Sequence, residues 1–259
     1  MLPPKESGGY VPYVLYNLGG CIFNVISSVI VLLYCIIFGG NAFLYMFALF
    51  GIAAAIINGV PLPAGQVNND GRNVVSFKND PLALKAFLMQ LNIYAEVSSG
   101  TRLKDIPDEL FDISEFSGSS DPIAATVSVF AENKLMDQMK FNEAYELASK
   151  LCDTEFELFG VHRGLLTCDR IYCAILFGED KEKIDTFFSK EQKVFMSSMK
   201  NDITVLRTNY LYALFVEKNV LKASKIKERF DKRCKKHPLK ADVESEIQLV
   251  KYMIRAKGE

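Results

Sequence analysis

The aspartate at position 70 is the residue whose type and place in the sequence best fit a chemical role. It is the first charged side chain after 63 residues, Ser7 to Asn69, that contain no Asp, Glu, Lys, Arg or His. Charge beside hydrocarbon is costly unless it has a partner, so an ionisable group at this edge is a functional candidate. The alternative is structural, because an Asp followed by Gly, as in Asp70-Gly71, often caps the next helix.

The remaining reactive side chains give weaker signals. His162 and His237 are unrelated by helical spacing, and we interpret them as ordinary surface or partly buried histidines. The six cysteines form no Cys-x-x-Cys pair, which favours a reducing compartment over a disulfide framework. The Gly-Gly pairs all flank or lie in the apolar region, so no phosphate-binding loop is predicted.

A basic run lies near the C-terminus, interrupted by Glu228 and Asp231. Its members are Lys222, Lys225, Lys227, Arg229, Lys232, Arg233, Lys235 and Lys236. Such a run is either a solvated helix face or a surface that binds anionic lipid on the cytoplasmic side. Nucleic acid is not an expected partner, because no aromatic residues alternate with the charges as single-strand binding requires.

The uncharged stretch predicts the elements that position Asp70. Two apolar spans, 11–38 and 42–60, are separated by the turn Gly39-Gly40-Asn41. About 20 helical residues cross the hydrocarbon core, and only internally hydrogen-bonded elements are stable there. We therefore expect a transmembrane hairpin in a multi-pass protein of the cell membrane, with the lipid bilayer as its first partner. The Lys- and Arg-containing tail favours a cytoplasmic C-terminal domain.

Polar and small residues follow one face of the first span. Asn17, Gly20, Asn24 and Ser27 recur at a 3-4-3 spacing that suits close helix packing and interhelical hydrogen bonds. Packing against the second span alone is one interpretation. A two-helix hairpin does not easily surround two asparagines, so we also expect other membrane helices, either from a missing N-terminal part of this chain or from a partner subunit.

The rest of the chain predicts helices. We expect three segments: the hairpin at 1–62, the Asp-Gly segment at 63–120, and a soluble all-α domain at 121–259. Within the Asp-Gly segment we expect an amphipathic helix at 82–98, a charged connector at 102–111 and a flexible linker at 114–120. Asp121 is the expected cap of its first helix. The expected helices are 122–136, 140–152, 161–178, 181–199, 203–217, 219–236 and 240–256, from apolar spacings of three and four. The part from Ala131 to Leu151 is similar to half of a tetratricopeptide-like repeat, which predicts a helical-repeat scaffold.

Several of these elements together resemble a known family. Four short motifs follow each other in an order that resembles the distal part of site-2 proteases. They are Asn17-Leu18-Gly19-Gly20 with Asn24, the pair Asn58 and Pro61, Asp70-Gly71 with Asn73, and the connector Gly100 to Pro107. These are membrane-embedded zinc metalloproteases, and small bacterial members with a helical tail are the most similar. The resemblance covers Pro3 to Phe111.

The resemblance implies that Asp70 is the third protein ligand of a catalytic zinc. The other two ligands would come from a His-Glu-x-x-His helix, whose Glu is the general base. No His-Glu-x-x-His segment occurs in this chain. We therefore expect either a truncated sequence with the zinc-binding helix upstream or a degenerate, non-catalytic relative; in both cases this chain alone binds no zinc and is inactive. The alternative function is a membrane-anchored interaction protein without enzymatic activity, whose helical domain recruits a protein or peptide partner.

Overall fold

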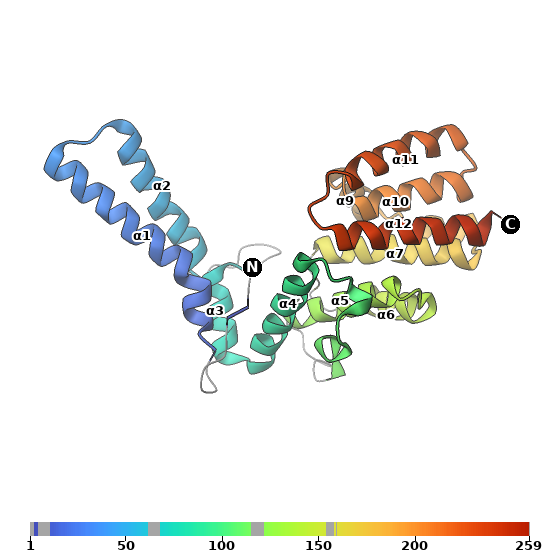
Figure 1. Cartoon of the computed structure of the whole chain (residues 1–259), viewed down its shortest axis with the longest axis horizontal. Helices are drawn as coiled ribbons and strands as arrows, with labels where there is room; N and C mark the ends of the chain where they lie inside the picture. The colour runs from blue at the N-terminus through green and yellow to red at the C-terminus, as the bar shows by residue number, and fades with distance from the viewer. Residues whose placement is uncertain are drawn as a thin grey trace. The chain divides into compact units, whose positions relative to one another are not determined.

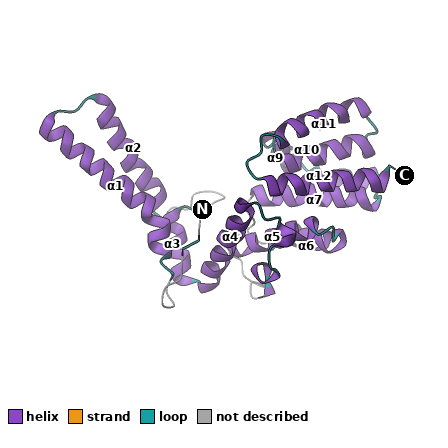
Figure 2. Cartoon of the chain, in the orientation of Figure 1, coloured by secondary structure: helices purple, strands orange, loops and turns teal. Residues whose placement is uncertain are grey.

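The computed structural model describes residues 3–4, 11–61, 68–114, 122–153, 158 and 160–258. Within these ranges the regular secondary structure is helical, and no strand is found (Figure 2). The expected fold class, two apolar N-terminal helices followed by an all-α domain, is confirmed. The chain forms two compact units, Leu2–Leu88 and Met89–Glu259. The three-part division and the repeat-like character stay predictions.

The first unit is built on an antiparallel helical hairpin (Figure 1). Helices α1 (Tyr13–Phe38) and α2 (Ala42–Gly59) begin and end within two residues of the expected spans. Gly39 adopts a positive φ of 83°, which glycine tolerates, and the side chain of Asn41 caps α2 by accepting a hydrogen bond from the Leu44 amide at 3.1 Å. Both helices are long and apolar enough to cross a membrane.

Small side chains let α1 and α2 approach closely. A methyl group on Gly51 would lie 2.2 Å from Ser28 Oγ, and one on Gly40 would lie 2.4 Å from Cys35 Sγ. Ala48 and Ala55 are buried on the same side of α2. Small residues at such intervals are typical of membrane helix pairs, in which close backbone contact replaces the hydrophobic effect.

Helix α3 (Asp70–Asn79) packs against both arms of the hairpin, and α4 (Pro81–Ser99) follows it. Pro81 occupies the first position of α4, one residue before the expected start of this helix. Aromatic rings connect the start of α1 to this region: Phe77 lies 5.9 Å from Tyr13 and 4.8 Å from Phe87 between ring centroids. These contacts hold the C-terminal end of α3 beside the start of α1 and beside α4.

The second unit is a helical domain centred on α7 (Gly160–Phe177), nine of whose residues are buried. It contacts α5 (Pro122–Asp137), α6 (Phe141–Asp153), α10 (Ile203–Leu211) and α12 (Lys240–Lys257). Helix α11 (Val220–Cys234) packs on α10, as Figure 1 shows. The apolar spacing in 141–148 was informative, since Phe141, Ala144 and Ala148 are all buried and Tyr145 packs on Phe177 at 5.7 Å.

The single helix expected over 181–199 is wrong. The structure has α8 (Lys181–Thr186) and α9 (Lys190–Ser198), separated at Phe187–Ser189. The break turns Phe188 onto the ring of Tyr212, 4.8 Å between centroids, and Ser189 caps α9 by accepting a hydrogen bond from the Gln192 amide. Tertiary packing of an aromatic side chain therefore overrides the continuous helical pattern.

Two further segments differ in detail from a plain helix or loop. The helix expected at 203–217 ends in a π-helical segment, η4 (Tyr212–Val216). The charged connector contains two short 3₁₀ turns, η1 (Leu103–Asp105) and η2 (Asp108–Phe111), held to α5 by the ion pair of Arg102 with Asp137. The linker at 114–120, beyond Ser114, and the Asp121 cap lie outside the described residues.

Candidate functional site

The candidate site lies where α2 ends and α3 begins, and Asn69 holds the two helix ends together. Its side-chain oxygen accepts a hydrogen bond from the Arg72 amide at 2.9 Å, which caps α3. Its side-chain nitrogen donates to the carbonyl oxygens of Ile57 at 2.8 Å and Val60 at 2.6 Å. One amide thus satisfies an orphan donor of α3 and two carbonyls at the end of α2. The cap expected at Asp70 belongs to Asn69 instead, one residue earlier.

Gly71 allows the two helix ends to touch. A methyl group at this position would lie 2.1 Å from the carbonyl oxygen of Gly59 and 3.0 Å from the backbone nitrogen of Pro61. Both of those atoms belong to the backbone, so no side-chain rotation can relieve the overlap. The Asp-Gly pair therefore has a direct physical meaning here: the glycine permits a contact that fixes the position of the preceding aspartate.

Asp70 itself occupies the first turn of α3, where the positive end of the helix dipole favours a carboxylate. The side chain is partly buried, and this burial raises the pKa of the carboxyl above its ordinary value. It lies within electrostatic range of Cys21 on α1. Among the described residues, no hydrogen bond or ion pair engages this carboxylate. Asp70 is therefore a positioned carboxylate that is available to an additional group.

Asn17 and Asn73 meet beside Asp70, although they are 56 positions apart. The side-chain nitrogen of Asn73 donates to the side-chain oxygen of Asn17 at 3.4 Å, and Asn17 donates to the carbonyl oxygen of Tyr13 at 2.8 Å. The side-chain oxygen of Asn73 is buried and has no partner in the described part of the chain. The junction therefore contains a second unsatisfied polar atom.

The remaining predicted site residues add no side-chain hydrogen bond to this junction in the described ranges. Asn58 and Pro61 are exposed at the end of α2, and Pro61 reaches the junction through its backbone nitrogen, next to Gly71. On α1 the face that packs on α2 carries Cys21, Ser28 and Cys35, so the expected stripe is shifted by about one residue. Gly20 is exposed with no neighbour within 4 Å of an added methyl group.

Asn24 lies near α2 through its backbone, since its carbonyl oxygen lies 3.4 Å from the methyl position of Gly51. Ser27 donates to that same carbonyl oxygen, at 3.2 Å. Gly20 lies outside the face that packs on α2, and the alternative, in which other membrane helices cover this side of α1, stays a prediction. The small residues of α2 decide which side of α1 is covered.

The described residues do not fit a catalytic zinc site. Such a site takes three protein ligands around an open position, and no group of three His, Cys, Asp or Glu side chains in the described ranges could hold a metal. His162 lies in the first turn of α7, where burial lowers its pKa, and His237 accepts a hydrogen bond from the Leu239 amide at 3.3 Å. Neither histidine belongs to the unit that holds Asp70.

The second unit contains a buried ionic network that the sequence reasoning missed. Arg207, 1% exposed, is paired with Asp169 of α7 and with Glu246 of α12, the latter at 3.0 Å. Thr204 donates to the same Glu246 oxygen at 2.8 Å. Glu132 of α5 is fully buried nearby, and burial followed by the charge of Asp169 raises its pKa well above the ordinary value. No sequence signal pointed to this cluster, because its members come from four separate helices.

Comparisons of the chain with protein-family models, with curated proteins and with solved structures find no match.

Proposed function

We propose that this chain is a membrane-anchored helical protein whose hairpin crosses the bilayer twice and holds the helical domain at the cytoplasmic surface. The observation that carries the proposal is the outer surface of the hairpin. Ile36, Phe38 and Phe43 are 75%, 72% and 75% exposed, and they are typical of many large apolar side chains along both helices. A core helix of a soluble domain would bury such residues.

The free energy of transfer of the apolar outer surface of α1 and α2 favours lipid over water as the surrounding medium. Removing one large apolar side chain from water contributes about 1.5–3 kcal/mol. Both helices are free of charged residues from end to end, so no desolvation cost of an ion opposes insertion. The first charge, Asp70, follows the end of α2 and lies in α3. Apolar length, lack of charge and outward-facing side chains thus support the same arrangement.

Membrane extraction tests the anchor. We expect the full chain to stay in the membrane pellet after a wash with alkaline carbonate. Ile26→Lys, on the exposed side of α1 near its middle, should release a large fraction, because a lysine at the centre of a span costs about 2.5–3.5 kcal/mol. Val194→Lys, on the exposed surface of α9, is the matched control and should behave as the parent chain. Release of the parent chain by carbonate would overturn the proposal.

Protease protection tests the two crossings. An epitope tag placed after Gly40, in the turn of the hairpin, should be accessible from the side opposite to a tag at the C-terminus, and the C-terminal tag should face the cytoplasm. Two tags accessible from the same side would contradict a hairpin that spans the bilayer.

The helical domain is the proposed recruiting part, with a protein or peptide as its partner. We expect the membrane-bound full chain to bind such a partner saturably. We also expect Ile26→Lys, which affects anchoring alone, to leave the affinity unchanged while the bound partner moves to the soluble fraction. A partner that binds equally well to membranes lacking the chain would count against this role.

A second candidate function rests on the free carboxylate of Asp70 at the hairpin junction. We infer that Asp70 contributes one ligand to a metal site completed by side chains from outside this sequence, as the resemblance to site-2 proteases implies. The support is that Gly71 and Asn69 fix Asp70 beside the end of α2 and that its carboxylate has no partner in the described ranges.

Metal analysis of the assembly tests this second candidate. The chain is purified in mild detergent from native membranes together with any bound subunits, and its zinc content is measured by mass spectrometry. Asp70→Asn should lower the zinc content. Asp80→Asn is the control, because an asparagine preserves the cap that Asp80 forms on the Leu82 amide. Zinc that is absent, or that is insensitive to Asp70→Asn, would reject the role of Asp70 as a ligand.

A further inference from the structure

The basic run on α11 is divided between two faces of the helix. Two lysines are paired with carboxylates of the same helix: the half-buried Lys227 with Asp231 at 2.7 Å, and the exposed Lys232 with Glu228 at 2.8 Å. On the inner face Lys222, Lys225 and Arg229 follow a three- and four-residue spacing and point to α10. The two faces of one helix therefore have different net charge.

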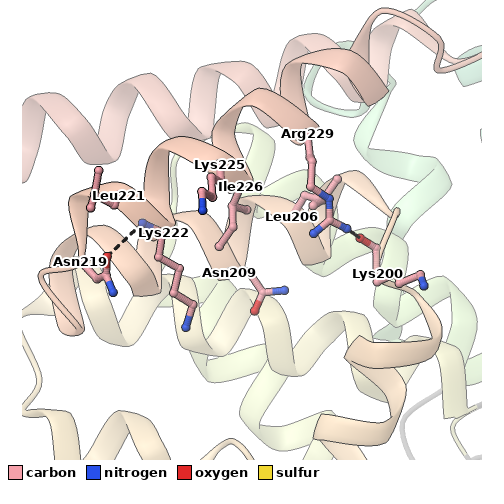
Figure 3. A pocket seen from close by; sticks show the side chains of 9 residues that line it. All are labelled: Lys200, Leu206, Asn209, Asn219, Leu221, Lys222, Lys225, Ile226 and Arg229. Carbon is pink, nitrogen blue, oxygen red and sulfur yellow. Dashed lines mark hydrogen bonds between the residues drawn. The ribbon is translucent and has the colours of Figure 1, made fainter.

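The inner face lines an open groove of about 580 Å³ between α10 and α11 (Figure 3). Nine residues line it, and they include four cations and no carboxylate: Lys200, Leu206, Asn209, Asn219, Leu221, Lys222, Lys225, Ile226 and Arg229. Cationic and amide side chains thus surround an apolar floor. This combination suits a ligand with an anionic head and a hydrocarbon portion.

The cations of the groove are only partly neutralised. Lys222 donates to both carboxylate oxygens of Glu217, at 2.8 and 2.7 Å. One guanidinium nitrogen of Arg229 donates a hydrogen bond to the carbonyl oxygen of Lys200 at 2.9 Å. This bond orients the guanidinium and leaves its positive charge uncompensated. In the described ranges, no carboxylate contacts Lys200, Lys225 or Arg229. An anion in the groove would therefore meet the uncompensated charges of Lys225 and Arg229, whereas the Lys200 ammonium points away from both (Figure 3).

Two exposed apolar side chains stand beside the groove. Val220 and Leu221, at the start of α11, are 67% and 80% exposed, and Lys218 and Lys222 flank them. Large apolar residues bordered by lysines are typical of segments that sit at a membrane interface, where lysine meets the headgroups and the apolar side chain enters the acyl boundary. The mouth of the groove therefore has the composition of a membrane-facing surface.

From these observations we propose that the groove between α10 and α11 binds the phosphate headgroup of an anionic membrane lipid. The phosphate lies beside Lys225 and Arg229, and the adjoining hydrocarbon lies on Leu206 and Ile226. The proposal rests on the membrane anchoring proposed above, which keeps the domain near lipid. The chemistry of the groove itself is independent of the hairpin.

Calorimetric titration of the full chain in non-ionic detergent tests the groove. The probes are dihexanoyl phosphatidic acid, dihexanoyl phosphatidylcholine and inorganic phosphate. We expect saturable binding of the phosphatidic acid only. The double variant Lys225→Gln/Arg229→Gln should weaken it about 25-fold, since each cation near an anionic lipid contributes about five-fold in affinity.

A matched double variant keeps the test specific. Lys227→Gln/Lys232→Gln removes the same charge from two positions of α11 that do not line the groove, and it should leave the affinity within about two-fold of the parent. Equal losses in the two double variants would show non-specific attraction and overturn the groove. Binding of inorganic phosphate as tight as that of the phosphatidic acid would assign the groove to a soluble phosphate compound and reject the lipid. The titration is made in detergent and does not depend on membrane insertion. Absence of lipid binding would therefore not affect the carbonate extraction result, and release of the chain by carbonate would not affect the titration.

Discussion

The two units of this protein each contain a polar cluster, and the clusters are built in opposite ways. At the hairpin junction, neighbouring residues from Asn69 to Asn73 act on the nearby end of α2 through short hydrogen bonds and a glycine contact. In the helical domain, Glu132, Asp169, Arg207 and Glu246 come from four helices and meet in the core. The first cluster leaves a carboxylate partly open, whereas the second encloses its charges.

This difference separates two uses of buried polarity. A cluster built from a turn fixes a local geometry and can present a free group. A cluster enclosed by four helices must pair its charges or keep a carboxyl protonated, as the raised pKa of Glu132 favours, because leaving an ion unpaired in the interior is costly. Substitutions should therefore have different consequences in the two units.

Removing the central cation of the enclosed network should have the largest effect. Arg207→Met leaves Asp169 and Glu246 buried without their partner, and we expect a loss of about 3–5 kcal/mol in the free energy of unfolding. Native-state hydrogen exchange of α7 and α10 amides in the full chain measures it. Lys232→Met, which removes the exposed pair with Glu228, is the control, with a loss of at most about 1 kcal/mol. Similar effects of the two substitutions would remove the distinction between enclosed and surface charge.

At the junction the sharpest perturbation is Gly71→Ala. The added methyl group meets backbone atoms of α2, so α3 must shift, and overpacking of this kind costs about 1–3 kcal/mol. Gly20→Ala is the matched control on α1, where nothing lies near the added group, and alanine should stabilise the helix by up to about 1 kcal/mol. Exchange protection of α3 amides reports both changes. The two substitutions should change stability in opposite directions. A Gly71→Ala chain as stable as the parent would show that the close contact is unimportant.

Two substitutions of Asn69 distinguish its cap on α3 from its hydrogen bonds to the end of α2. Asn69→Asp keeps the acceptor for the Arg72 amide but removes the donors to Ile57 and Val60, while Asn69→Ala removes both functions. We expect the free energy of unfolding to fall by about 1 kcal/mol in Asn69→Asp and by about 2 kcal/mol in Asn69→Ala. Asn58→Ala, at an exposed position of α2, should change little. Thermal unfolding in detergent ranks the three, and equal losses for Asp and Ala would mean that only the bridge to α2 matters.

The smallest expected effect is a pH dependence from Glu132. Its folded-state pKa is raised, so the folded chain holds a proton that the unfolded chain releases. Stability should therefore fall as the pH rises from the ordinary carboxyl pKa towards the raised one. Glu132→Gln should flatten this slope, and Glu143→Gln, on the exposed surface of α6, should leave it unchanged. A slope in Glu132→Gln equal to that of the parent chain would place the titrating group elsewhere, such as at Glu246, whose pKa burial raises to about 7.

The sequence determined the parts of this protein that depend on local composition. Sixty-three uncharged residues fixed the two apolar helices and their turn. Prolines and apolar spacing fixed the helices at Pro81 and through 122–153, because helix starts and amphipathic faces follow from neighbours in the chain. The Asp-Gly pair was found as a special turn for the same reason.

Only the tertiary structure decided the rest. It assigned the cap to Asn69 instead of Asp70, selected Cys21, Ser28 and Cys35 over Gly20 as the covered face of α1, and broke the helix at Phe187. It also joined Arg207 to two distant carboxylates. These features depend on which surfaces meet in space, and the physical terms that fix them, steric contact and desolvation, act between residues that the sequence keeps far apart.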